Sequence, residues 1–178
     1  MLIKDVVLSK GLTGFYFDDQ RAIRQGNYQE NGIAYLGEPV TPGFSKIRQA
    51  GESVSVQLVL EDDQVAYGDC AAVQYSGAGG RDPLFLADRY IPQIEEYVVP
   101  KLVGRKLTSF RELAEEIDQL TNGEGKPLHT AIRYGVTQAI LDAVARSKHL
   151  TMAEVIVEEY GLELIPERVK IFAQTGDD

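Results

Sequence analysis

A glycine-rich segment, residues 75–83, is the part of the sequence with the clearest potential for chemistry. The pattern places it between a strand and a helix, where glycine loops cradle phosphate groups. The segment matches neither the G-x-x-x-x-G-K-[ST] pattern nor the full G-x-G-x-x-G pattern, and Asp82 at the expected helix start would repel a phosphate. It therefore indicates a loop that needs positive φ angles or lies close against a ligand. Gln74, directly before it, suits either a small polar ligand or a buried amide satisfied by the backbone.

Two histidines and one cysteine complete the set of reactive side chains. His129 and His149 are expected at opposite ends of one helix, roughly 30 Å apart by helical rise. They cannot share a metal or a catalytic site, so each is predicted to be structural or exposed. Cys70 lies in an apolar strand without a histidine nearby in sequence. A buried small hydrophobic residue is favoured there over a nucleophile.

Three pairs of adjacent aspartates are the remaining candidates for chemistry, at positions 18–19, 62–63 and 177–178. The middle pair reads as a turn. The other two could bind a cation, but adjacent acids in loops are more often solvated, and no complete set of metal ligands is visible. The residues by themselves thus predict no nucleophile, general base or metal site in this chain.

The elements that must position these residues begin with a three-stranded antiparallel meander. Residues 2–8 form the first expected strand, residues 53–60 alternate with period two, and residues 65–68 start the return strand after a polar turn. Residues 11–51 are irregular and rich in glycine and aromatic side chains. Because so many aromatics are unusual in a solvated linker, we expect this stretch to fold over a surface that needs covering.

Four helices are expected after the meander. Asp82 is the expected cap of the first, with Pro83 at its first position and a kink at Pro92. Serine and threonine capping boxes open the second and the fourth, and the third covers about residues 128–148. The third helix carries a row of small residues that permits close approach of another element. Residues 169–174 read as a short final strand, and the whole is an α+β arrangement.

Composition limits the class of protein. The chain has 178 residues, a net charge of −9, 44% hydrophobic residues and a single cysteine. This apolar fraction argues against disorder, and the lone cysteine excludes an internal disulfide and points to the cytoplasm. No apolar run reaches the roughly 20 residues that cross a bilayer, so no membrane partner is expected. The acidic balance argues against nucleic acid as a partner.

Six stretches, in the same order along the chain, resemble the methylaspartate ammonia-lyases of the enolase superfamily. They cover nearly the whole chain, which makes the resemblance far more specific than any short motif. The matching stretches are residues 15–20 (FYFDDQ), 39–44 (PVTPGF), 48–58 (RQAGESVSVQL), 68–87 (GDCAAVQYSGAGGRDPLFLA), 128–143 (LHTAIRYGVTQAILDA) and 172–178 (FAQTGDD).

The resemblance implies a fold and a reaction. The fold is an N-terminal α+β capping domain, residues 1–164, followed at residues 165–178 by the first strand of a (β/α) barrel whose remainder is absent. The reaction is the reversible loss of ammonia from L-threo-3-methylaspartate, giving mesaconate in amino-acid catabolism. Family members use Mg²⁺, are stimulated by K⁺ and form homodimers, and their partner is a small amino-acid substrate.

The resemblance also implies which residues of this chain meet the substrate. Gln174 matches a glutamine that contacts it, and Gln74 and Phe172 match residues that line the same pocket. The family's lysine base, its catalytic histidine and its three metal carboxylates lie beyond Asp178, so no catalytic or metal residue is expected in this chain. His129 is not the catalytic histidine. We therefore predict that the isolated 178-residue chain is inactive.

Two other interpretations remain open. The first is a stand-alone α+β binding or interaction module of a split enolase-type protein, which docks onto a separate barrel chain. The expected final strand argues against it, because a finished module would not keep a strand without a partner. The second is a sister lyase that acts on another amino acid.

Overall fold

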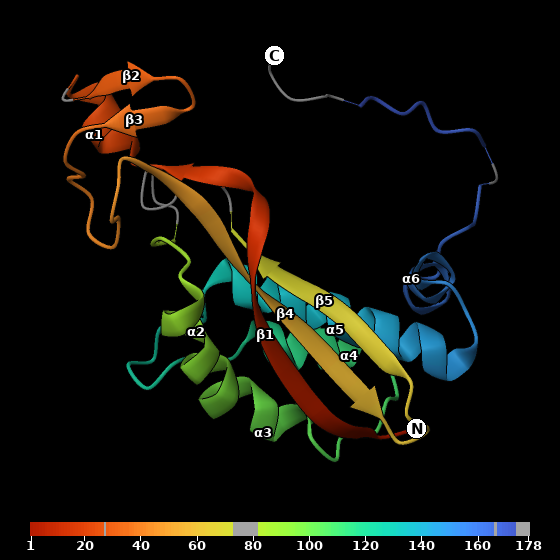
Figure 1. Ribbon diagram of the computed structural model, residues 1–178. Helices are drawn as coiled ribbons and strands as arrows, with labels where there is room; N and C mark the ends of the chain where they lie inside the picture. Colours follow the sequence, from red (N-terminus) through yellow and green to blue (C-terminus); the bar gives the residue numbers. More distant parts are fainter. Residues whose placement is uncertain (27, 73–81, 166, 174–178) are drawn as a thin grey trace.

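A three-stranded antiparallel sheet is the centre of the fold in this computed structural model, which describes residues 1–26, 28–72, 82–165 and 167–173 (Figure 1). Its strands, in the order β1-β4-β5, are β1 (Ile3–Asp18), β4 (Arg48–Leu60) and β5 (Val65–Ala71). The predicted meander is therefore confirmed, although β1 and β4 extend well beyond the expected stretches. Their extra length comes from residues 9–18 and 48–52, which the irregular glycine pattern had hidden.

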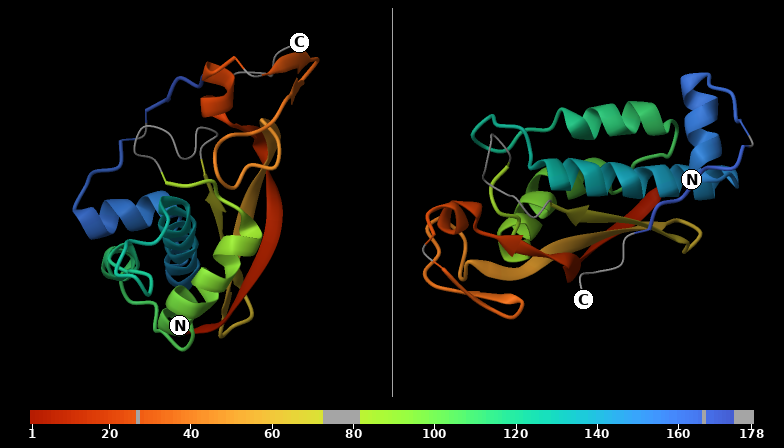
Figure 2. Two further views of the ribbon diagram at one scale, coloured as in Figure 1. Left: turned by 90° about the vertical axis from the view of Figure 1, so that its left-hand side faces the viewer. Right: turned by 90° about the horizontal axis from the view of Figure 1, so that it is seen from above.

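The helices cover one face of this sheet (Figure 2). In β4 the alternate residues Val54, Val56, Leu58 and Leu60 are fully buried and face the helices. The intervening side chains of β4 are partly exposed on the opposite face, as period-two alternation requires. Within the described part of the chain, no helix is long and apolar enough to cross a membrane.

The long helix α5 (Thr130–Lys148) packs directly on β5 through two glycines. A Cβ atom on Gly135 would collide with the backbone of Cys70 and Asp69, and one on Gly68 with the backbone of α5. Because α5 lies so close to β5, its side chains also bind the free edge of that strand: Tyr67 N–H donates to Asp142 at 2.9 Å. The predicted close approach at the row of small residues is confirmed, and the element that approaches is β5.

The first helical region departs from its prediction. It comprises α2 (Ala87–Gln93), a π-helical stretch η1 (Ile94–Val98) and α3 (Val99–Leu102). The predicted start at Asp82 and Pro83 is wrong, because Asp82 caps another helix and α2 begins at Ala87, whose N–H donates to Glu52 of β4 at 2.7 Å. Pro92 has no N–H for the helical ladder, and the π-helical stretch follows directly after it.

The two capped helices begin as predicted, although α4 ends earlier than the expected stop at Asn122 and Gly123. In α6 (Met152–Tyr160) both halves of the Thr151 capping box are present, and the helix ends at Gly161 in the left-handed conformation. In α4 (Phe110–Asp118), Ser109 accepts from Glu112 N–H at 3.3 Å. Further N-terminal donors of α4 are satisfied by a residue of α6, Glu159.

Residues 19–47, called here the excursion, leave the sheet between β1 and β4. They contain α1 (Gln20–Arg24) and a small antiparallel hairpin of β2 (Gln29–Asn31) and β3 (Ala34–Leu36). The excursion sits at one end of the sheet (Figure 1). The sequence predicted that this stretch folds and is not a solvated linker. The helix and the hairpin of the excursion confirm that it is folded.

The expected final strand is not formed by the described residues. Residues 167–173 have no regular structure and pair with no strand. A strand takes its hydrogen bonds from a neighbouring strand, and neither edge strand of the sheet, β1 or β5, pairs with the described terminal residues, which run away from α6 (Figure 1).

Candidate functional site

At one end of the sheet, which we call the loop end, β1 ends beside the start of β4. The antiparallel pairing places Asp18, the last residue of β1, opposite Arg48, the first residue of β4. The end of β5 at Ala71 pairs with Ser53 on the same half of β4. The excursion therefore leaves and returns at this end, and β5 ends five residues along β4 from it. The longest described connection of the sheet thus lies at the loop end, as is common for functional surfaces.

An ion pair closes the base of the excursion. The Arg48 guanidinium donates to both carboxylate oxygens of Asp18, at 2.7 and 2.8 Å. It also lies over the Tyr35 ring, 4.0 Å from the centroid, and so ties the β2–β3 hairpin to the sheet. The hydrogen bond to Asp18 raises the pKa of Arg48 above its already high ordinary value. This pair is therefore structural.

Asp19 holds the excursion together from inside. Its carboxylate caps α1 and also accepts from the N–H groups of Val40 and Thr41 at 2.7 and 2.8 Å. Burial alone would raise the pKa of Asp19, but these donors and the Thr41 hydroxyl lower it below its usual range. The expectation of solvated acids at positions 18–19 is wrong: Asp19 is 1% exposed. Both carboxylate oxygens of Asp19, like those of Asp18, accept hydrogen bonds from protein donors. The two adjacent aspartates are therefore not arranged as cation ligands.

Residues 82–87, called here the return segment, lead the chain from residues 73–81 back into α2. Asp82 accepts a hydrogen bond from Thr130 N–H, the first helical donor of α5, at 2.7 Å. The Pro83 carbonyl lies 3.0 Å from His129 Nε2. Leu84 packs with Phe17 and Phe44 in a small apolar cluster at the foot of the excursion. The return segment therefore contacts α5, β1 and the excursion.

His129 is the N-cap of α5, and its ring is uncharged. Its Nδ1 accepts from Ala131 N–H at 3.0 Å, so its proton is on Nε2 and is donated to the Pro83 carbonyl. The ring stands edge-on against Phe85 and Tyr90, which stack on each other. Burial lowers the pKa of His129. Both ring nitrogens are occupied by the backbone, so His129 is structural and does not act as a base, as the sequence predicted.

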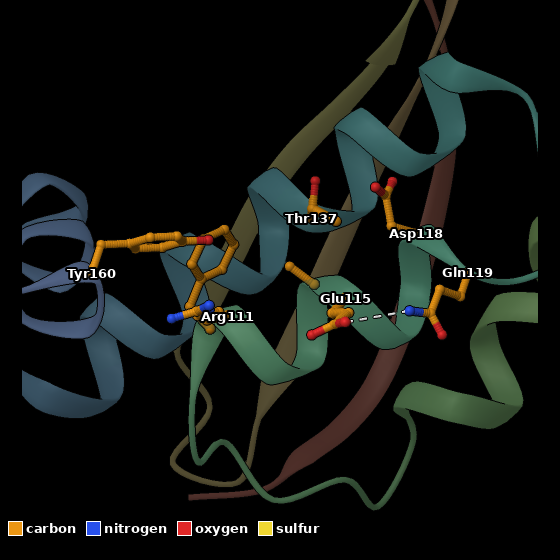
Figure 3. Close-up of a pocket in the computed structure, with 8 residues that line it drawn as sticks. Arg111, Glu115, Asp118, Gln119, Thr137 and Tyr160 are labelled. Atoms are coloured by element: carbon orange, nitrogen blue, oxygen red, sulfur yellow. Dashed lines mark hydrogen bonds between the residues drawn. The ribbon is translucent and has the colours of Figure 1, made fainter.

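Two surface cavities lie among the helices. One, of about 590 Å³, is bordered by the return segment, the start of α2 and residues 122–133. The other, of about 490 Å³, lies between α4, α5 and α6 (Figure 3). In the second, Asp118 pairs with Arg133 at 3.1 Å and Arg111 lies over the Tyr160 ring. Glu115 accepts from Gln119 at 3.4 Å, so these charged groups contact other side chains of the domain, and no sequence pattern predicted either cavity.

The predicted substrate residues are only partly visible. Gln74 and Gln174, like Asp177 and Asp178, lie outside the described residues. Phe172 is described and 87% exposed, in a terminal segment that runs toward the end of the molecule that holds the excursion (Figure 1; Figure 2, left). An aromatic ring so exposed has no packing role within the described part of this chain.

The reactive side chains that are described carry no catalytic arrangement. Cys70 is fully buried, and burial raises the pKa of its thiol to about 12, so it is a packed apolar residue as predicted. Asp62 and Asp63 form the predicted turn between β4 and β5. Among the residues that the structure describes, no three histidine, cysteine or acidic side chains converge as a metal site.

Comparison with known proteins identifies the domain. A family model described as "Methylaspartate ammonia-lyase N-terminus" matches residues 1–161. The chain belongs to the methylaspartate ammonia-lyase family. It is 61% identical over all of its 178 residues to a methylaspartate ammonia-lyase of Clostridium tetanomorphum, and 51% identical to one of Citrobacter amalonaticus. It spans 43% of the length of each of these two family relatives.

Solved structures of these family members share the fold. The crystal structure of β-methylaspartase from C. tetanomorphum, a magnesium complex, matches the whole chain with a TM-score of 0.94 and 43% of its own chain. The C. amalonaticus methylaspartate ammonia-lyase containing (2S,3S)-3-methylaspartic acid matches 95% of this chain and 41% of its own, with a TM-score of 0.91. The sheet, helices and excursion of the present chain are thus the N-terminal architecture of this family.

Proposed function

We propose that this chain is the capping part of a methylaspartate ammonia-lyase, which removes ammonia from L-threo-3-methylaspartate to give mesaconate. In this proposal residues 1–164 form the capping domain and residues 165–178 begin the barrel domain. The observation that carries the proposal is 61% identity over the whole chain, together with a TM-score of 0.94 against β-methylaspartase. Similarity this high over all 178 residues makes a different chemistry in the whole protein a poor alternative.

The contribution of this chain is to bind and enclose the substrate. Gln74 would offer one donor and one acceptor group to the polar amino acid, and Phe172 and Gln174 would approach it from the start of the barrel. The loop end carries the excursion on a rigid sheet, which suits a surface that closes a pocket and excludes water. His129 and Cys70 are buried and make structural contacts, so neither is assigned the proton removal from C3.

Magnesium and potassium belong to the whole protein in this proposal. The C. tetanomorphum relative was solved with magnesium, and metal binding of a substrate carboxylate would stabilise the charge that develops after proton loss. The described residues of this chain offer no fitting ligand set, so no metal step is assigned to them. K⁺ as an activator, a homodimer and a cytoplasmic location are further expectations of the same proposal.

The test compares the full-length protein with the 178-residue chain. With Mg²⁺ present, the full-length protein is expected to convert L-threo-3-methylaspartate to mesaconate, followed by the ultraviolet absorbance of the conjugated product. The 178-residue chain is expected to show no turnover. A full-length protein without this activity refutes the proposal, and turnover by the chain alone refutes the division of labour between cap and barrel.

Two controls address the alternatives. Aspartate and 3-alkyl aspartates of different size, measured side by side, separate a methylaspartate enzyme from a sister lyase. The gene sequence beyond codon 178 separates one continuous protein from a cap that docks onto a separate barrel chain. Gln74→Ala in the active protein is expected to raise KM about tenfold or more, because the cost of losing a hydrogen bond to a charged group is about 1.5–3 kcal/mol.

A further inference from the structure

The larger of the two surface cavities, of about 590 Å³, is lined by α2 and by the segment that leads into α5. Its volume lies within the range of small-molecule sites, about 300–1,000 Å³. α2 contributes Arg89, Tyr90 and Gln93, and the rest of the lining comes from the start of the return segment and from positions 122–133. None of these residues was expected to contact the substrate, so the proposed function gives the cavity no role.

The hydroxyl of Tyr90 opens on this cavity although the residue is only 4% exposed. Its ring is stacked on Phe85 and stands edge-on to His129, with centroid distances of 4.8 and 4.9 Å. Among the residues that the structure describes, this hydroxyl forms no hydrogen bond, and no side-chain nitrogen or oxygen is both fully buried and unpartnered. The hydroxyl is therefore reached from the cavity, and the packed ring holds it in place as a hydrogen-bond donor to an occupant.

A guanidinium lies beside this hydroxyl. Arg89 Cζ is 5.5 Å from the centroid of the Tyr90 ring. The carboxylate next to it in sequence, Asp88, pairs instead with Lys10 of β1 at 2.8 Å. Within the described ranges of the chain, no acid forms an ion pair with Arg89, so its donors are available to a ligand.

The other two cations of the lining are already paired. Lys126 binds Glu124 at 2.8 Å, and Arg133 binds Asp118 at 3.1 Å. A negatively charged group that enters the cavity is therefore expected to bind Arg89 and not these two side chains.

A carboxylate of the lining limits which anion fits. Asp82 Oδ2 accepts from Thr130 N–H at 2.7 Å, and Oδ1 accepts from no other residue in the part of the chain that is described. Burial raises the pKa of Tyr90, while the charge of Arg89 lowers it and that of Asp82 raises it, so both charges act on the same hydroxyl. A cation and an anion thus flank one neutral donor, which disfavours a multiply charged anion.

We propose that this cavity binds a small amino or hydroxy acid. The ligand carboxylate accepts from the Arg89 guanidinium and from the Tyr90 hydroxyl, and the ligand ammonium or hydroxyl group donates to Asp82. Guanidinium groups are the preferred protein partners of carboxylates, and hydrogen bonds to a charged group are the stronger ones. Such binding involves no turnover and goes beyond the lyase function proposed above.

Saturation-transfer NMR of the full-length protein, which detects weak ligands, tests the site with four probes. L-alanine and L-lactate carry a carboxylate and a donor group, propionate carries only the carboxylate, and inorganic phosphate is a multiply charged anion. L-alanine and L-lactate are expected to bind most tightly, propionate about threefold to tenfold more weakly because it leaves Asp82 without a donor, and phosphate not at all.

Two variants locate the binding. Tyr90→Phe keeps the stacked ring and removes only the hydroxyl, and it is expected to weaken binding of L-lactate about tenfold, as one lost hydrogen bond to a charged group does. Arg89→Gln changes an exposed side chain and is expected to weaken binding by tenfold or more. Lys101→Gln is the matched control, because Lys101 is an exposed cation of α3 that does not line the cavity, and it is expected to bind as the wild type does.

Each outcome has a defined meaning. A wild type that binds neither L-alanine nor L-lactate overturns the site, and so does binding that is unchanged in both Tyr90→Phe and Arg89→Gln. Propionate that binds as tightly as L-lactate overturns the role of Asp82, and phosphate that binds most tightly overturns the ligand class. None of these results depends on turnover of methylaspartate, so a failure of this site leaves the proposed lyase function untouched.

Discussion

Gly135→Ala is expected to cost the domain about 2 kcal/mol, because it forces α5 away from β5. The added methyl group would lie 2.6 Å from the carbonyl carbon of Asp69 and 2.7 Å from Cys70 Sγ, and closer still to the Cys70 backbone nitrogen. Carbon atoms in contact normally lie about 3.5–4.0 Å apart, so helix and strand must separate by about 1 Å. Overpacking of this kind typically costs about 1–3 kcal/mol, and rigid backbone places the cost at the upper end.

Two effects modify this figure. Alanine is a better helix former than glycine by about 1 kcal/mol, which offsets part of the loss and leaves about 2 kcal/mol. The hydrogen bonds from the β5 edge to Gln138 and Asp142 of α5, at 3.2 and 2.9 Å, lengthen with the separation. Gly68→Ala, which collides with the same helix and meets Ala139 N at 2.6 Å, is expected to cost a similar amount.

The assay is urea unfolding of the 178-residue chain, followed by far-ultraviolet circular dichroism. Gly14→Ala is the matched control, because a Cβ there meets no atom within 4 Å and the residue is not at positive φ. It is expected to change the free energy of unfolding by less than about 0.5 kcal/mol. The double variant at Gly68 and Gly135 is expected to lose less than the sum of the two single losses, because one displacement relieves both collisions. If Gly135→Ala is as stable as the control, the close approach of α5 and β5 is refuted.

Three further predictions concern titratable groups. Burial lowers the pKa of His129 below its ordinary 6.5, although Asp82 and the Pro83 carbonyl act in the opposite direction. As the pH falls, the unfolded chain therefore takes up the His129 proton before the folded chain does. The His129 contribution to stability is constant above about pH 6.5 and falls below it by up to about 1.4 kcal/mol per pH unit. Urea unfolding at pH 7.5 and 5.5 is expected to show a steeper loss in the wild type than in His129→Asn, and equal losses contradict it. Glu159→Gln is expected to cost about 1–2 kcal/mol, because a charged acceptor is lost to the N-terminus of α4; thermal unfolding at pH 7 measures it, with exposed Glu163→Gln as the neutral control. Cys70, with a thiol pKa raised to about 12, is expected to resist an aromatic disulfide reagent at pH 8 until urea unfolds the chain, and rapid labelling of the folded chain would contradict its burial.

The predictions that succeeded from sequence depend on regular patterns. Alternating residues 54–60 predicted the central strand β4, and Thr151 with Glu154 predicted the start of α6. Both signals lie within a few residues, so the sequence contains all the information. The row of small residues at Gly135 also predicted a close approach, but the sequence could not say that β5 would occupy it, since the collision with Cys70 joins residues 65 positions apart.

The predictions that failed involve aspartates whose partners are distant in sequence. Asp82 followed by Pro83 has the form of a helix cap, and Asp82 does cap a helix, but the helix is α5, 48 residues further on. Asp19 looked solvated because adjacent acids usually are. It is buried because Val40 and Thr41 return to it across the excursion. The functional assignment came from the resemblance, since the residues expected to contact the substrate carry no local pattern of their own.

Carboxylates from other elements bind the N-termini of three helices of this domain. This explains the wrong prediction at Asp82 and accounts for part of the acidic composition. Glu52 of β4 binds the first N–H of α2, Glu159 of α6 that of α4, and Asp82 of the return segment that of α5. Each places a negative charge at the positive end of a helix dipole, where it is stabilising. Because each also joins two elements distant in sequence, these acids do more than cover the surface. They determine where α2, α4 and α5 begin, and the start of α5 in turn holds the return segment through Asp82.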